Sequence, residues 1–103
     1  MQEVYLTYIE KDGITYLKVG STTNWSRRKH QYKKAGYGVV SEIFHIPTKS
    51  HKKAIECEDA LRDYFIEKYN NQEWCFCPKD RFMCGYCSVE DYRKTRKLIK
   101  SLL

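Results

Sequence analysis

Two runs of β-branched and aromatic residues, 4–9 and 14–19, flank the dipeptide Asp12-Gly13 near the start of the chain. Asp-Gly is a preferred centre of two-residue β-turns because both residues tolerate positive φ angles. The pattern therefore predicts a β-hairpin in which Thr7 lies opposite Lys18. Since successive side chains of a strand point to opposite faces of a sheet, this register also decides which residues share a face.

One face of the predicted hairpin is mostly apolar, and the other is mixed. We expect the apolar face to carry Val4, Leu6, Tyr8, Thr15, Leu17 and Val19. The mixed face carries Tyr5, Thr7, Tyr16, Lys18 and Gly20. The first set is typical of a core surface, whereas the second makes Tyr5 and Lys18 diagonal neighbours.

Capping residues and terminators divide the rest of the chain into further helices and strands. We expect a helix over 25–35, which Asn24 caps and Gly36 ends. A strand over 39–46 follows and stops at Pro47. A second helix then begins at a Thr48 or Ser50 cap and ends near Tyr69. A hairpin with strands 74–77 and 82–86 follows. The last helix runs from a Ser88 cap to Leu103, with Asp91 in the capping-box position.

This order of elements predicts an α+β fold with a small three-stranded antiparallel sheet (ββαβα), a Cys-rich hairpin and a C-terminal helix. A chain of 103 residues has the size of a single domain. We expect the domain to span 1–103, with a core over 1–71, the Cys-rich hairpin over 72–87 and the basic helix over 88–103.

One acidic residue of the second predicted helix stands where an apolar residue is expected. The apolar stripe of this helix comprises Ala54, Cys57, Leu61, Tyr64 and Phe65. Glu58 falls inside the stripe, whereas Glu56 falls outside it. A carboxylate on a core-facing stripe costs free energy unless it is paired or binds a cation. The sequence leaves both interpretations open, a structural ion pair or a metal ligand.

The first predicted helix places Arg28 and Tyr32 on its inner face and Arg27 on its outer face. The simpler interpretation is that Arg28 only pairs with Glu58. The other is a phosphodiester site, in which cations neutralise phosphate, a carboxylate holds a metal ion and a phenol acts as a base beside a cation that lowers its pKa.

Three stretches resemble the GIY-YIG endonuclease superfamily: Val4-Tyr5, Lys18-Val19-Gly20-Ser21-Thr22-Thr23-Asn24-Trp25-Ser26-Arg27-Arg28 and Ala54-Ile55-Glu56-Cys57-Glu58. The resemblance covers residues 3–71. It implies a metal-dependent DNA endonuclease in which Tyr5 activates the attacking water, Arg28 steadies the phosphate and Glu58 binds Mg²⁺ or Mn²⁺. Asn70 or Asn71 would be the asparagine that usually follows the helix.

Three positions depart from the usual motifs of that superfamily. Glu3-Val4-Tyr5 lacks the glycine of the first motif, and Tyr32 stands where some members have His. Lys18 replaces the usual Tyr of the second motif, which looks like the branch with a lysine-type second motif. A lysine beside Tyr5 can still promote deprotonation of the phenol, so Lys18 and Tyr32 stay among the expected catalytic residues.

Four of the five cysteines cluster near the C-terminal end: Cys75, Cys77, Cys84 and Cys87. Four thiolates on a short hairpin can hold Zn²⁺ tetrahedrally, and such a metal stabilises a small domain. Packed thiols and disulfides are the alternatives, and a reducing compartment favours zinc over disulfides. Cys57 lies on the apolar stripe and is expected to pack as a small hydrophobe.

The chain is basic, with 19 Lys and Arg residues against 13 Asp and Glu residues. This balance favours a polyanionic partner, and we expect duplex DNA to contact Lys29, Lys33, Lys34 and Asn71. The last helix adds Arg93, Lys94, Arg96, Lys97 and Lys100. Two other functions remain open: an inactive nucleic-acid-binding module on the same fold, or a zinc-stapled protein-interaction domain.

Neither a signal peptide nor an apolar run of about 20 residues, the length that spans a bilayer, is recognisable in the sequence. We therefore expect an intracellular protein without a membrane partner.

Overall fold

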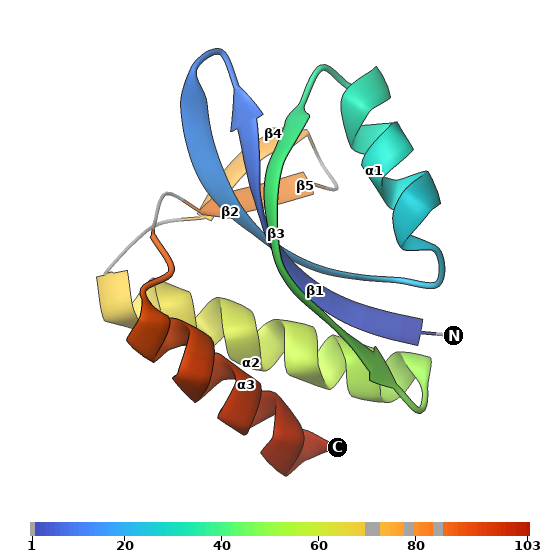
Figure 1. Ribbon diagram of the computed structural model, residues 1–103, viewed down its shortest axis with the longest axis vertical. Helices are drawn as coiled ribbons and strands as arrows, with labels where there is room; N and C mark the ends of the chain where they lie inside the picture. The colour runs from blue at the N-terminus through green and yellow to red at the C-terminus, as the bar shows by residue number, and fades with distance from the viewer. Residues whose placement is uncertain (1, 70–72, 78–79, 84–85) are drawn as a thin grey trace.

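The computed structural model describes residues 2–69, 73–77, 80–83 and 86–103, with only the backbone path at 39–40, 73–77 and 80–83 (Figure 1). The order of elements agrees with the prediction, and the fold is α+β. The elements are β1 (Gln2–Lys11), β2 (Ile14–Thr22), α1 (Trp25–Lys34), β3 (Gly38–Thr48), α2 (His51–Tyr69), β4 (Glu73–Cys77), β5 (Asp80–Met83) and α3 (Val89–Leu102).

The hairpin of β1 and β2 has the predicted register. Thr7 lies opposite Lys18, and Tyr5 lies opposite Gly20. Asp12 and Gly13 form the turn with φ angles of 54° and 78°. These angles lie in the left-handed region, which Gly and Asp reach at lower cost than most residues. A local dipeptide thus sets the pairing of the two longest central strands.

The sheet has five strands in the order β3-β1-β2-β5-β4, all paired antiparallel. The three predicted strands are present, and β5 extends the sheet beyond them by pairing Met83 with Leu17 of β2. Two predicted boundaries were wrong. β3 continues through Pro47 to Thr48, because an edge strand tolerates the missing amide hydrogen of proline. β5 is Asp80–Met83 rather than 82–86, because Asp80 already pairs with Cys77.

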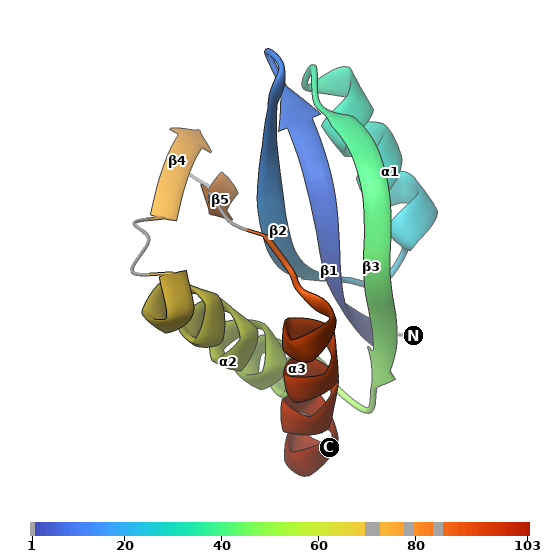
Figure 2. The same cartoon turned by 60° about the vertical axis from the view of Figure 1, so that its left-hand side comes forward.

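The helices cover opposite faces of the sheet. Leu6, Leu17 and Val19 belong to a core that α2 and α3 complete with Cys57, Leu61, Phe65 and Ile99. The other face packs Tyr5, Ile9 and Tyr16 against Tyr32 of α1. Figure 2 shows α1 behind β3, on the side away from α2 and α3. The two faces are those that strand alternation predicts. No helix in the described part of the chain combines the length and apolar character needed to cross a membrane.

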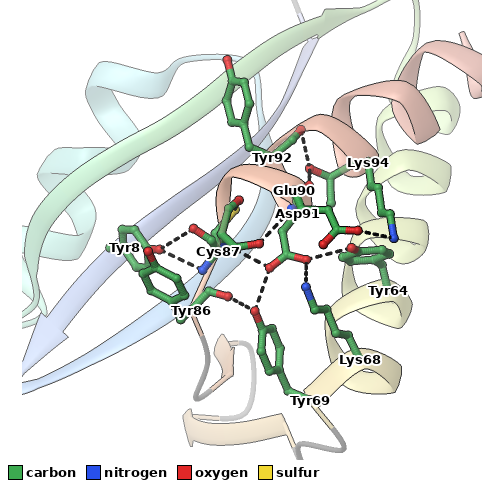
Figure 3. A network of polar contacts seen from close by, with 12 residues as sticks. Tyr8, Tyr64, Lys68, Tyr69, Tyr86, Cys87, Glu90, Asp91, Tyr92 and Lys94 are labelled. Atoms are coloured by element: carbon green, nitrogen blue, oxygen red, sulfur yellow. Dashed lines mark hydrogen bonds and ion pairs between the residues drawn. The ribbon is translucent and has the colours of Figure 1, made fainter.

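A buried carboxylate joins α3 to α2 (Figure 3). Ser88 and Asp91 form the predicted capping box at the start of α3. Asp91 is fully buried. Its carboxylate accepts hydrogen bonds from the hydroxyls of Tyr64 and Tyr69 and forms an ion pair with Lys68. Burial acts to raise the pKa of Asp91, but the bonds from Lys68, the Ser88 amide and both tyrosines hold it well below its usual range.

The packing face of α3 does not include the first apolar residue of the helix. From its apolar character Val89 would be expected to pack inward, but it is 70% exposed. Asp91, Thr95 and Ile99 are the buried residues of the helix instead. The capping box sets this rotation, because Asp91 must point toward α2 to reach its partners.

We expect Asp91→Asn to lower the free energy of unfolding by about 2 kcal/mol, the range of hydrogen bonds to a charged group. All four partners can donate to the carboxylate, and an amide turns an NH₂ group toward one of them. Because the pKa of Asp91 is lower in the folded state, its charge stabilises the fold at pH values above the unfolded-state pKa of about 4. This stabilisation is lost as the pH falls and the carboxylate becomes protonated. Thermal melts should therefore show a large difference from wild type at neutral pH that narrows below pH about 4.

Asp63→Asn is the matched control, since Asp63 is an exposed carboxylate on α2. An equal loss of stability in both variants, or a difference that does not depend on pH, would contradict a structural role for the Asp91 charge.

Candidate functional site

Two phenols and a guanidinium meet on the face of the sheet that α1 covers. Tyr5 of β1 is completely buried, and its hydroxyl lies 2.5 Å from the hydroxyl of Tyr32 on α1. Arg28, one turn before Tyr32, lies close enough to both phenols for its charge to act to lower the pKa of each. Three of the residues expected at the site therefore form one cluster.

The start of α1 decides which arginine joins this cluster. The Asn24 side chain accepts a hydrogen bond from the Arg27 amide at 3.0 Å and caps the helix as predicted. With this start, Arg27 is exposed and Arg28 is half-buried beneath the helix. Helical periodicity alone selects the inward arginine.

Burial makes both phenols weak acids. Desolvation raises the pKa of Tyr5, against the lowering effects of the Tyr32 hydrogen bond and the Arg28 charge. The pKa of Tyr32 is raised by burial and by Tyr5. Burial acts to lower the pKa of Arg28, but its contacts with the two phenols leave it raised. At neutral pH the cluster thus holds two neutral phenols and one cation.

Glu58 lies on the inner side of α2, as its place in the apolar stripe predicts. Its side chain is 17% exposed, against 41% for Glu56. Its carboxylate pairs with Arg62 at 3.7 Å, while Arg62 also pairs with Asp59 at 3.3 Å. The expected structural partner, Arg28, lies instead at the two phenols. The negative charge of Glu58 nevertheless acts on Tyr5, whose pKa it raises.

Lys18 lies on β2 on the same face as Gly20 and is almost fully buried. Its register opposite Thr7 makes it a diagonal neighbour of Tyr5, as predicted. The cation whose charge lowers the pKa of Tyr5 is Arg28. Lys18 therefore lies beside the cluster, on the same face of the sheet as Tyr5.

Comparison with known proteins places these residues in a family. The T5orf172 domain family model matches residues 3–100. The chain belongs to the T5orf172 domain family. These domains are associated with the GIY-YIG and HNH-like endonucleases, in agreement with the resemblance seen in the sequence. No curated protein and no solved structure gave a significant match.

A second layer of this T5orf172 domain supports Tyr5 and was not predicted. The Trp25 ring lies 4.6 Å from the Tyr5 ring and 4.5 Å from the His45 ring. Its indole nitrogen donates to Glu42 at 2.8 Å. Glu42 also pairs with Lys29 at 3.1 Å, and its carboxylate lies 3.2 Å from the Nε2 atom of His45. The Trp25 side chain is thus held against Tyr5 from two sides.

This layer changes the interpretation of one expected DNA contact. Lys29 is paired with Glu42, so part of its charge is neutralised within the domain. Lys33 and Lys34 are exposed on α1, and Asn70 and Asn71 lie outside the described residues. Among the expected contacts that the structure describes, the two lysines at the end of α1 are exposed and have no ion pair with another described residue.

The expected metal ligands fall into two groups. Glu58 offers a partly exposed carboxylate, a hard oxygen ligand of the kind that Mg²⁺ and Mn²⁺ accept together with water. The side chains of Cys75, Cys77 and Cys84 lie outside the described part of the structure, which contains no group of three or more His, Cys, Asp or Glu side chains placed to hold a metal. Burial and the Asp91 charge raise the pKa of Cys87 to about 11. Cys57 is buried in the core, as expected for a small hydrophobe.

Gly20 makes room for the Tyr5 ring. A Cβ atom at this position would lie 2.5 Å from Tyr5 Cζ and 2.9 Å from Cε2. Both distances are below ordinary van der Waals contact, so the buried ring would have to move. The glycine of the second motif therefore has a direct steric role in the T5orf172 domain.

We expect Gly20→Ala to cost about 1–3 kcal/mol of unfolding free energy, as overpacking of a core does. Gly38→Ala is the control, because a Cβ there meets nothing within 4 Å. Chemical denaturation of both variants checks this prediction. A Gly20→Ala variant as stable as Gly38→Ala would show that the ring shifts without strain.

Proposed function

We propose that this domain is a DNA endonuclease of the GIY-YIG type, with a lysine-type second motif and a divalent metal held by Glu58. The convergence of Arg28 on the Tyr5–Tyr32 pair, with Glu58 close enough to act on Tyr5, is the observation that carries the proposal. Hydrolysis of a phosphodiester needs positive charge at the phosphate and a group that takes a proton from water.

The cations and the phenols divide these tasks. Arg28 is the half-buried member of the cluster, so it binds and stabilises the negative phosphate oxygens. Lys18 adds positive charge from the sheet side. Tyr5 is the proton acceptor in its phenolate form, after its own hydroxyl proton has passed to solvent, and Tyr32 is hydrogen-bonded to the Tyr5 oxygen. A divalent ion on Glu58 supplies Lewis-acid stabilisation of the developing charge when it is bound.

The complete burial of Tyr5 sets a condition on this mechanism. A proton from an attacking water reaches the Tyr5 oxygen only through the Tyr32 hydroxyl or after Tyr32 has moved aside, because the two oxygens are in contact. Tyr32 is thus a proton relay or a gate in the proposed reaction.

The same burial supports a second candidate function. A domain whose phenol does not become accessible binds nucleic acid without cutting it, as an inactive module on this fold would. The exposed lysines of α1, Lys33 and Lys34, serve duplex binding in either function, and α1 contains no acidic residue.

We expect Glu58→Gln and Tyr5→Phe each to abolish plasmid nicking in Mg²⁺ or Mn²⁺ while the fold and duplex affinity are retained. Loss of the Glu58 charge costs little stability, because Arg62 keeps Asp59 as a partner. Tyr5→Phe removes only the hydroxyl of the proposed base. Supercoiled plasmid assays and thermal melts of both variants provide the measurement.

Glu56→Gln is the matched control, because Glu56 lies two residues away on the other side of the same helix, where it pairs with Lys53 at 3.3 Å. Full nicking by Glu58→Gln would end the nuclease proposal at this site. Absence of nicking in wild type, with salt-sensitive duplex binding, would establish the binding module instead.

The rate of cleavage should rise with pH between about 7 and 9. Burial raises the pKa of Tyr5 above its usual value of about 10, so the phenolate fraction grows roughly tenfold per pH unit throughout this range. Initial nicking rates at constant metal concentration and ionic strength give the profile. A rate that is flat across this range would exclude Tyr5 as the group whose deprotonation limits the reaction.

We further propose that the four clustered cysteines hold one structural Zn²⁺ per chain. Such a site would fix the hairpin of β4 and β5 to the start of α3, where Cys87 lies next to the Ser88 cap. Elemental analysis of protein purified without chelator should give about one zinc per chain, and chelation should lower the melting temperature. Metal-free protein with unchanged stability would contradict the proposal.

A further inference from the structure

The exposed side of α3 carries four cations to which no residue in the described part of the structure gives an acidic partner. Arg93, Arg96, Lys97 and Lys100 fall within an arc of about 100° around the helix axis. We call these four residues the α3 basic surface. They line a shallow hollow of about 310 Å³ together with Tyr92, whose ring lies 5.4 Å from the Arg96 guanidinium.

The carboxylates of α3 do not neutralise this surface. Asp91 is buried on the opposite side of the helix, and Glu90 pairs with Lys94 at 2.9 Å. No ion pair among the described residues involves a member of the α3 basic surface. Four exposed positive charges therefore lie within about 10 Å along the helix, counted from its rise per residue.

The α3 basic surface and the cluster of Tyr5, Arg28 and Tyr32 lie on opposite sides of the sheet. α3 packs through Ile99 on the face of the sheet that contains Leu6 and Leu17, whereas Arg28 and Tyr32 belong to α1 on the other face. Figures 1 and 2 show the same arrangement, with α3 and α1 separated by the sheet. A duplex that contacts Lys33 and Lys34 on α1 therefore lies on the other side of the sheet from α3.

We propose that the α3 basic surface binds a second segment of duplex DNA while α1 holds the first. A row of cations along a helix matches the phosphate backbone, which carries one charge per about 1.7 Å of duplex. The inference rests on the nucleic-acid binding of the proposed function but does not require cleavage. It makes the domain a bridge between two segments of DNA.

The chemistry of α3 favours nucleic acid over an anionic membrane. A helix that binds a lipid surface buries an apolar face among the acyl chains. The apolar side of α3 is already used in the core, through Ile99 and Leu102. The exposed arc offers arginine, lysine and one tyrosine, a combination suited to phosphates and sugars.

A capture experiment without divalent metal tests the proposal. Protein is bound to a biotinylated duplex on beads, and the retention of a second, fluorescent duplex is measured per molecule of bound protein. We expect wild type to retain the second duplex in low salt. A quadruple variant should retain at least about tenfold less of the second duplex, since each lost phosphate contact weakens binding. Its substitutions are Arg93→Gln, Arg96→Gln, Lys97→Gln and Lys100→Gln.

Lys97→Gln and Lys94→Gln form a matched pair on the same helix. Lys97→Gln should reduce the slope of log affinity against log salt for the second duplex by about 0.9, the loss of one phosphate contact. Lys94 is already paired with Glu90, so Lys94→Gln should leave the slope unchanged. The single variants also keep the test valid if the quadruple variant is unstable.

Three results would overturn the inference: no second-duplex retention by wild type, equal retention by the quadruple variant, or binding of wild type to phosphatidylserine vesicles in preference to the second duplex. Second-duplex retention by a protein that does not nick plasmid would refute the nuclease proposal while supporting this one. Nicking without retention would do the reverse.

Discussion

The register of the β1–β2 hairpin is the constraint on which the candidate site depends. It places Tyr5 opposite Gly20, the one residue type that leaves space for the buried ring. A slip of one residue would move Tyr5 to the core face and replace Gly20 with a side chain as its neighbour. The position of the phenol is therefore fixed by backbone pairing, and α1 closes over it with Tyr32 and Arg28.

Much of the fold follows from short-range patterns. The Asp12-Gly13 turn determines the hairpin register, and strand alternation then separates the residues that meet α1 from those that meet α2 and α3. Helical periodicity distinguishes Arg28 from Arg27 and Glu58 from Glu56. Each of these inferences depends on residues within a few positions of one another, where local geometry alone sets the direction of a side chain.

The features that the sequence did not reveal depend on pairing between distant segments. Trp25, Glu42 and His45 meet because β3 pairs with β1 through two register shifts, which no turn or spacing encodes. Asp91 could be recognised as a capping residue, but its partners Tyr64, Lys68 and Tyr69 are set by the packing of α3 on α2. The same packing turned Val89 outward. One exception is local, because Glu58 pairs with Arg62, one turn along its own helix, rather than with the arginine of α1.

Pro47 has a consequence for how this sheet ends. β3 is an edge strand, and an unpaired edge is a template on which another chain can add a strand. Proline has no amide hydrogen to donate, and the two register shifts between β1 and β3 bend the strand along its length. Both features oppose the addition of a further strand at this border of the sheet, so that copies of the domain can come close together without joining through their backbones.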